Sequence, residues 1–142
     1  MRVVLDTDVM LSAFVSPSGA SRLWLAAALR REVLMVLSVP LVIEYESVMS
    51  RPQHLLRARA SLLDVGLLLD AVVRQGELTS ISYLWRPQLR DPGDEMVLET
   101  AVNGRADRIL TFNLADFAGA KGFGIAVGQP GPAWRERQEG LT

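Results

Sequence analysis

The feature that most limits the fold of this chain is a series of short, uninterrupted apolar runs. The clearest runs cover Val3–Leu5, Val33–Leu37, 108–111 and 124–127, and a weaker run covers 78–81. Strands that are apolar on both faces suit a sheet covered on both sides, and such sheets are usually parallel. We therefore expect a central parallel sheet of four or five strands.

Helical segments lie between these runs. Apolar side chains recur at helical spacing within 21–31, 40–49, 61–74 and 93–102,. Strands that alternate with helices predict a single α/β domain with right-handed crossovers and helices on both faces of the sheet. The 142 residues have room for one core only,. We expect the domain to span 1–127 and to be followed by a loosely ordered tail, 128–142, in which Trp134 could anchor the chain,.

Composition narrows the possible functions. The absence of cysteine excludes a disulfide framework and thiolate metal sites,. The chain has no apolar run of about 18 residues and no signal-peptide pattern, so we expect a cytoplasmic protein that does not bind membranes,. A protein that holds nucleic acid by neutralising phosphates is usually basic, but the formal charge here is −1,. A nucleic-acid ligand would therefore need another source of positive charge, such as a bound metal ion.

Polar side chains follow two of the predicted strands at the point where each strand ends. Asp6 and Asp8 come after the first run, and Asn113 and Asp116 come after the run over 108–111. Ligands of open parallel sheets bind beyond the carboxyl ends of the strands. The alternative is that these residues form turns or cap helices. For Asp8, Asn113 and Asp116 both interpretations stay open.

A helix that begins near residue 92 carries a carboxylate in an unexpected place. Asp91 followed by proline is typical of a helix N-cap, and this structural role is sufficient for it,. The apolar stripe of this helix consists of Val97, Leu98, Ala101 and Val102. Asp94 falls in the middle of that stripe, whereas Glu95 and Glu99 fall toward its flank. A charge that faces a core is costly unless it is paired or binds a metal ion, so Asp94 is the strongest functional candidate.

The remaining candidate carboxylates are Glu44 and Glu46, which flank the apolar stripe of the helix over 40–49 about equally. Helix geometry does not choose between them, and a solvated face is the alternative for each. Clustered carboxylates raise each other's pKa unless a cation lies between them. Oxygen ligands without His or Cys select Mg²⁺ or Mn²⁺. The chemistry that suits such a site is metal-assisted hydrolysis of phosphodiesters.

Four short motifs occur in order along the chain. They cover Val3–Val9, Val42–Val48, Arg90–Ala101 and Ala106–Asn113. Together they resemble the PIN-domain ribonucleases, particularly the small stand-alone VapC-like toxins of bacterial toxin–antitoxin pairs. The resemblance implies a PIN-like fold, a metal-dependent endoribonuclease with Mg²⁺ or Mn²⁺, RNA as the substrate, and a cognate antitoxin protein as the inhibitor.

The resemblance also implies the residues of the site. It selects Asp6, Glu44 and Asp94 as catalytic and metal-binding residues, and it prefers Glu44 to Glu46. A fourth position falls to Asp116 or Asn113. The supporting residues are Thr7, Asp8, Asp91, Glu95 and Asn113. Two departures matter: Asp8 stands where the family usually has Asn, and Asn113 stands where many members have Asp.

Two other functions fit parts of the sequence. The first motif also resembles that of haloacid-dehalogenase-like phosphatases, in which Asp6 would be the nucleophile and Asp8 the acid and base. That family needs a lysine before its last acidic pair, but Lys121, the only lysine, comes after the acidic motifs. The second alternative is a PIN-like module that binds RNA or protein without cleaving RNA.

A partner surface is also suggested by the sequence. The segment Leu62–Val73 is apolar on more than one face, so it is buried either in the core or in an interface,. If an antitoxin or a second copy of the chain docks on this domain, this segment and Trp24 are the candidate contacts.

Overall fold

A parallel five-stranded sheet forms the centre of the computed structural model, which describes residues 1–81 and 91–141. The strand order is β3-β2-β1-β4-β5, and every neighbouring pair is parallel. The strands are β1 Arg2–Leu5, β2 Leu34–Leu37, β3 Glu77–Leu78, β4 Arg108–Leu110 and β5 Ala126–Gly128. The predicted parallel sheet of an α/β domain is confirmed. The last strand of the chain begins later than expected, and β3 is shorter than the run that predicted it.

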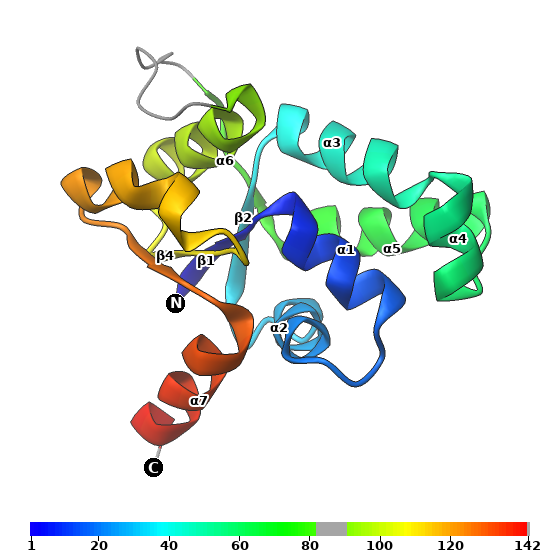
Figure 1. The fold of residues 1–142 in the computed structure, drawn as a ribbon, viewed down its shortest axis with the longest axis horizontal. Coiled ribbons are helices and arrows are strands. Elements are labelled where there is room, and N and C mark those ends of the chain that lie inside the picture. The colour runs from blue at the N-terminus through cyan, green and yellow to red at the C-terminus, as the bar shows by residue number, and fades with distance from the viewer. Residues whose placement is uncertain (82–90, 142) are drawn as a thin grey trace.

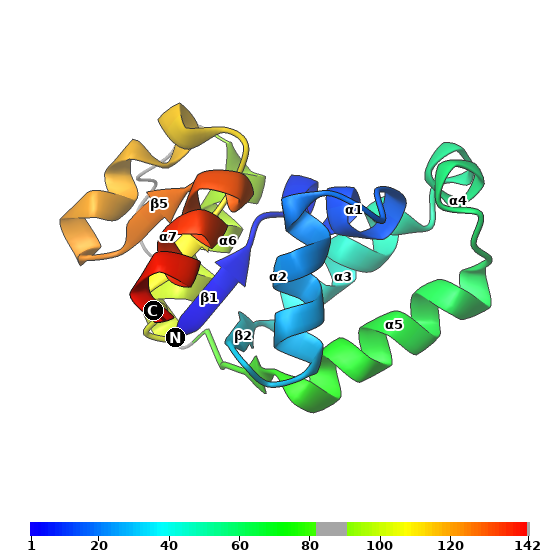
Figure 2. The same ribbon diagram turned by 90° about the horizontal axis from the view of Figure 1, so that it is seen from below.

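Helices cover both faces of this sheet. They are α1 Thr7–Val15, α2 Ala20–Leu29, α3 Val39–Met49, α4 Pro52–Ala58, α5 Leu62–Gln75, α6 Pro92–Asn103, the 3₁₀ helix η1 Leu114–Phe123 and α7 Pro130–Leu141. Helix α6 packs on β1, β2 and β4, whereas α2 and α7 pack together on the other side of the sheet (Figure 1). Helix α4 lies at the end of the molecule that is far from the strands (Figure 2). Within the described residues, no helix combines the length and hydrophobicity that crossing a membrane requires.

The end of the chain differs from the expectation of a loosely ordered tail. Residues Pro130–Leu141 form α7, which packs on α2. The indole Nε1 of Trp24 donates to the Pro130 carbonyl at 2.9 Å, and its ring meets that of Trp134 edge-on at 5.1 Å. Proline in the first helical turn costs no hydrogen bond, so Pro130 and Pro132 start this helix instead of preventing it. Trp134 is the anchor that the sequence suggested, but Trp24 is fully buried and cannot contact a partner.

Arg51 and Pro52 follow the end of α3 at Met49, as expected of a helix-breaking pair in the sequence. The short helix α4, which begins at Pro52, was not predicted. After β4, Asn113 occupies the N-cap position of η1, although its side chain makes no capping hydrogen bond there. The sequence also predicts an irregular stretch over 85–93, which contains two prolines. Its residues 85–90 lie outside the described part of the chain, whereas α6 begins at Pro92.

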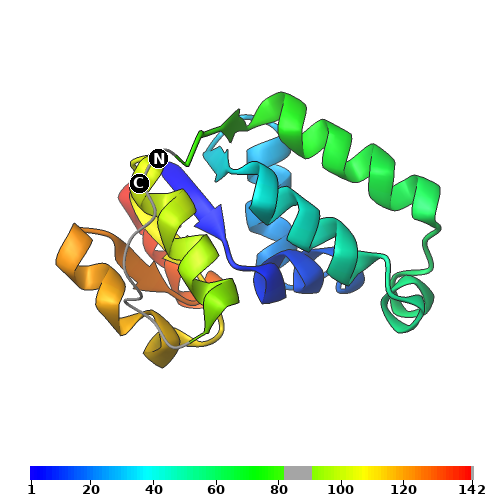
Figure 3. The same ribbon diagram turned by 90° about the horizontal axis from the view of Figure 1, so that it is seen from above.

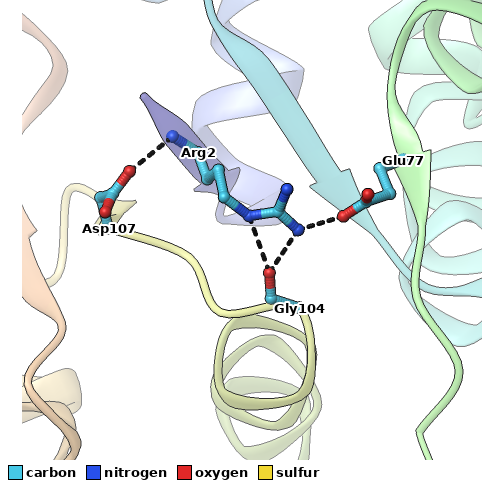
Figure 4. A network of polar contacts seen from close by, with 4 residues as sticks. All are labelled: Arg2, Glu77, Gly104 and Asp107. Atoms are coloured by element: carbon cyan, nitrogen blue, oxygen red, sulfur yellow. Dashed lines mark hydrogen bonds and ion pairs between the residues drawn. The ribbon is translucent and has the colours of Figure 1, made fainter.

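The amino-terminal edge of the sheet is closed by internal polar contacts around Arg2 (Figure 4). The Arg2 backbone N–H donates to Asp107 Oδ2 at 2.7 Å, and the guanidinium donates to the Gly104 carbonyl from Nε at 3.0 Å. The same guanidinium forms an ion pair with Glu77 at the start of β3. Arg2 therefore places a positive charge beside the two carboxylates of this edge.

Candidate functional site

An acidic cleft lies at the carboxyl edge of the sheet, where the strand order reverses. Strands β2 and β3 lie on one side of β1, and β4 and β5 lie on the other. This reversal is the place where open α/β sheets bind ligands. Strand β1 ends between α6 and α3 (Figure 3). The cleft has a volume of about 220 Å³ and is lined by Asp6, Thr7, Asp8, Glu44, Asp91, Gly93, Asp94 and Asn113.

Asp6 is the most deeply placed carboxylate of the cleft, and the residue is only 7% exposed. Its Oδ1 accepts from the Thr7 backbone N–H at 2.8 Å, which caps α1, and its Oδ2 accepts from the Thr111 hydroxyl at 2.7 Å. Burial raises the pKa of Asp6, although these hydrogen bonds act in the opposite direction,. Asp6 thus caps a helix and also faces the cleft with a fixed orientation.

Asp8 lies in the first turn of α1 and is half-buried. Its Oδ2 accepts from the Asn113 side-chain amide at 3.2 Å, but its Oδ1 is buried without a hydrogen-bond partner. Burial raises the pKa of Asp8 to about 7, and the negative charge of Asp6 adds to the effect,. A buried carboxylate oxygen that lacks a donor is a natural ligand for a cation.

Helices α3 and α6 each bring one further carboxylate into the cleft. Asp94 stands in the first turn of α6, and burial, followed by the charge of Asp6, raises its pKa to about 6. Glu44 on α3 is half-buried and lines the cleft, whereas Glu46 is exposed and lies outside it. The position of α3 therefore makes the choice that helix periodicity left open, and it is the choice that the family resemblance implied.

The other predicted residues divide into two groups. Asp91 accepts from the Gly93 N–H at 2.7 Å as the N-cap of α6, and it lines the cleft together with Thr7 and Asn113. Glu95 and Asp116 are not among the lining residues. Asp116 is exposed at the start of η1, yet its charge raises the pKa of both Asp6 and Asp94. Of the two candidates for the fourth position of the site, Asn113 lines the cleft and Asp116 lies outside its lining.

Two hydroxyl groups of the site were not predicted. Thr111, fully buried after β4, donates to Asp6 and accepts from the Asn113 backbone N–H at 3.0 Å. Tyr45, also fully buried, donates its hydroxyl proton to the Leu5 carbonyl at 2.5 Å. It thereby joins the residue after Glu44 to the residue before Asp6. In the sequence, both hydroxyls belong to apolar patterns, so only the tertiary structure shows their role.

The metal ion that the sequence implies would need several oxygen donors grouped around one point. Within residues 1–81 and 91–141, no three His, Cys, Asp or Glu side chains are grouped closely enough to hold one ion. The donors are nevertheless all oxygens, Asp8 has a buried oxygen without a donor, and the carboxylates raise one another's pKa. A cation would relieve that repulsion. The donor set therefore fits a hard divalent ion, although the side chains do not enclose one.

The chain is therefore an α/β domain with an acidic cleft at the point where the strand order of its parallel sheet reverses. A sequence model of the PIN domain matches residues 2–115, and the chain belongs to the PIN-domain family. PIN domains are generally nucleases, and they generally use divalent metal ions. Searches of curated proteins and of solved structures found no match to this chain.

Replacing Asp8 with Asn is expected to stabilise the metal-free protein at pH 8. The pKa of Asp8 is raised from 3.8 to about 7 in the folded state, so its contribution to stability is complete below about pH 4,. That contribution is lost as the pH rises through 7, because the folded protein then holds a buried charge. Asp8 is partly exposed, and solvent screens part of its charge. We therefore expect the free energy of unfolding of the variant to exceed that of the wild type by about 1–2 kcal/mol at pH 8.

Urea unfolding in EDTA between pH 4 and pH 8 measures this difference. The difference in the free energy of unfolding should vanish near pH 4. The control variant Asp70→Asn, at an exposed position of α5, should be as stable as the wild type throughout this pH range. A variant that is no more stable than the wild type at pH 8 would contradict the prediction.

Proposed function

We propose that this protein is a metal-dependent endoribonuclease that hydrolyses RNA phosphodiester bonds. The observation that carries the proposal is the convergence of Asp6, Glu44 and Asp94 on one cleft. These residues come from the end of β1, from α3 and from α6, which are far apart in the sequence. Structural capping explains Asp6 in part, but it does not explain why three elements direct carboxylates to one place.

In this proposal Asp6, Glu44 and Asp94 would hold Mg²⁺ or Mn²⁺, directly or through water. The bound ion would activate water and offset the charge of the phosphate. Thr111 and the Thr7 amide fix the orientation of Asp6, so this ligand does not have to reorganise during the reaction,. Asp8 has an oxygen that no protein donor occupies, and it is the candidate for accepting the proton of the attacking water,. Asn113 takes the fourth position, and Asp116 contributes through its charge.

We further propose that the protein is the cytoplasmic toxin of a toxin–antitoxin pair, as its resemblance to the stand-alone toxins implies. The partner segment predicted from the sequence is only partly used by the core. Val65, Leu69 and Val72 of α5 are buried, whereas Leu62, Leu63 and Leu67 are exposed. An antitoxin helix would cover these leucines, and a second copy of the chain is the alternative occupant.

Of the two rival functions, only one keeps a supporting observation. The neutral Asn113 at the fourth position and the open arrangement of the carboxylates favour a PIN-like module that binds RNA or protein without cleavage. The phosphatase alternative requires a lysine at the site. Lys121 lies in η1 and is not among the residues that line the cleft.

The test of the proposed function is cleavage of end-labelled RNA by purified protein, shown by mass spectrometry to be free of a bound partner. We expect cleavage with Mn²⁺ or Mg²⁺, its loss in EDTA, and its recovery when excess Mn²⁺ is restored. Cleavage that persists in EDTA would point to a contaminating metal-independent ribonuclease and would remove the support for the proposal. Calorimetric binding of Mn²⁺ without cleavage of any RNA would favour the binding module.

A further inference from the structure

Ser38 and Thr100 form a buried pair of hydroxyl groups between the two helices that carry Glu44 and Asp94. Ser38 is 1% exposed and is the N-cap of α3, directly after β2, whereas Thr100 is fully buried within α6. Their hydroxyl oxygens lie 2.7 Å apart. Neither residue lines the cleft, so any effect of this pair on the site must pass through the two helices.

The direction of this hydrogen bond follows from the other contacts of the pair. The Thr100 hydroxyl donates its only proton to the Met96 carbonyl at 2.9 Å, so it accepts from Ser38,. The Ser38 oxygen in turn accepts from the Leu41 backbone N–H at 3.3 Å. A continuous chain of hydrogen bonds therefore runs from the first turn of α3 to the backbone of α6.

This chain of hydrogen bonds supplies what apolar packing alone does not. The other buried residues of α6 are Val97, Leu98 and Ala101. Apolar burial is not directional, whereas the length of a hydrogen bond is fixed within a few tenths of an ångström. The contact between Ser38 and Thr100 therefore specifies the position of α6 relative to α3 more sharply than the apolar side chains do.

Similar contacts fix the other parts of the cleft. The buried Thr111 hydroxyl joins the end of β4 to Asp6, and the buried Tyr45 hydroxyl joins α3 to the Leu5 carbonyl at the end of β1. Each of the three elements that direct a carboxylate into the cleft is thus joined to a neighbouring element through a buried hydroxyl group. The pair Ser38 and Thr100 is the contact that joins α3 to α6.

We propose that Ser38 and Thr100 are positioning residues that set the separation of Glu44 and Asp94 across the cleft. This inference rests on the proposed function and adds two buried residues to it. Mg²⁺ requires nearly ideal placement of its ligands, and a misplacement of about 1 Å can cost about 100-fold in rate. Loss of this hydrogen bond should therefore weaken the binding of Mg²⁺ or Mn²⁺ and slow cleavage, with little effect on the affinity for RNA.

The test compares Thr100→Val, which removes the hydroxyl group, with Thr100→Ser, which keeps it but removes a methyl group. Calorimetry well below the unfolding midpoints should show Mn²⁺ binding about 5- to 10-fold weaker in Thr100→Val and within about 2-fold of the wild type in Thr100→Ser. With saturating Mn²⁺, Thr100→Val should lower kcat by about 10-fold and keep KM for RNA within about 2-fold. The control is Ser21→Ala, a buried serine of α2, which packs on α1, α5 and α7, and it should match the wild type.

A double-mutant cycle tests whether Ser38 acts through Thr100. Ser38→Ala alone should also weaken Mn²⁺ binding. Added to Thr100→Val, it should weaken binding less than it does alone, because the hydrogen bond is already absent. Fully additive losses would mean that the two hydroxyl groups act independently, and they would contradict the proposed pair.

These measurements separate the positioning role from the proposed function. If the wild type binds Mn²⁺ and Thr100→Val binds it more weakly than Thr100→Ser does, the positioning role stands even where no RNA is cleaved, and only the proposed function fails. If the wild type cleaves RNA and Thr100→Val matches it in Mn²⁺ affinity and kcat, the positioning role alone is refuted. Equal losses in Thr100→Val and Thr100→Ser would indicate a loosened core and would overturn it, as would a wild type that binds no Mn²⁺.

Discussion

Replacing Asp94 with Asn is expected to reduce RNA cleavage by about 100- to 1,000-fold while the protein remains folded. Losses of this size are typical when one preorganised electrostatic group is removed from an active site. Asn has nearly the same shape as Asp but carries no charge. It therefore cannot offset the positive charge of a divalent ion, and it binds such an ion less strongly. Single-turnover cleavage with saturating Mn²⁺ measures the effect.

The Asp94→Asn variant should lose activity without losing stability. The folded state raises the pKa of Asp94 from 3.8 to about 6, so its contribution to stability is lost as the pH rises through 6,. At pH 7.5 the charged group destabilises the metal-free protein. Asp94→Asn should therefore raise, or at least not lower, the unfolding midpoint in EDTA. A residue whose removal lowers activity and not stability serves the site and not the fold.

Glu99→Gln is the matched control for this variant. Glu99 lies on the same helix, is half-buried, and has a pKa raised by burial and by Glu95, but it does not line the cleft. Its cleavage rate should stay within about 2-fold of the wild type. If Asp94→Asn cleaves RNA at the wild-type rate, Asp94 does not belong to the site. Equal losses in both variants would indicate damage to α6 instead.

The sheet could be predicted from the sequence because its signal is local. Runs such as Val3–Leu5 are apolar at every position, and this pattern depends only on a strand being covered on both faces,. Helix α7 could not be predicted in the same way. Its order depends on Trp24, which is 106 residues before Pro130 in the chain, and its prolines and glycines are typical of a loop when read locally.

The candidate site shows the same division between local and long-range information. Asp6 at a strand end and Asp94 in an apolar stripe are local signals, and both residues line the cleft. Glu95 and Asp116 also satisfied local rules but lie outside it, because small rotations of α6 and η1 decide which side chain faces the cleft. Those rotations are set by packing between elements that are distant in the sequence.

Glu44 illustrates this limit, since the sequence could not separate it from Glu46. The two residues differ by about 200° around a helix and flank its apolar stripe on opposite sides. What selects Glu44 is the orientation of α3 on the sheet. Strands β1 and β2 pair at Arg2–Leu34 and Val3–Met35, and beyond this pairing the Leu5 carbonyl accepts from the Tyr45 hydroxyl. This contact turns the side of α3 that carries Glu44 toward Asp6.

The pair Glu44→Gln and Glu46→Gln should therefore give opposite results. Both changes remove one charge from the same helix with little effect on helix propensity. Glu44→Gln should lower cleavage by about 100-fold or more and weaken Mn²⁺ binding, measured by calorimetry, by at least about 10-fold. Glu46→Gln should leave both within about 2-fold, because Glu46 is exposed and outside the cleft,.

Thermal unfolding supplies a readout that does not depend on turnover. An ion that binds only the folded protein raises its stability with the logarithm of the ion concentration. Added Mn²⁺ should therefore raise the unfolding midpoint of Glu46→Gln as much as that of the wild type, and raise that of Glu44→Gln much less. The reverse result would mean that α3 presents its other side to the site. An equal response in both variants would mean that α3 supplies no ligand, and the ion would then be held by Asp6 and Asp94 without it.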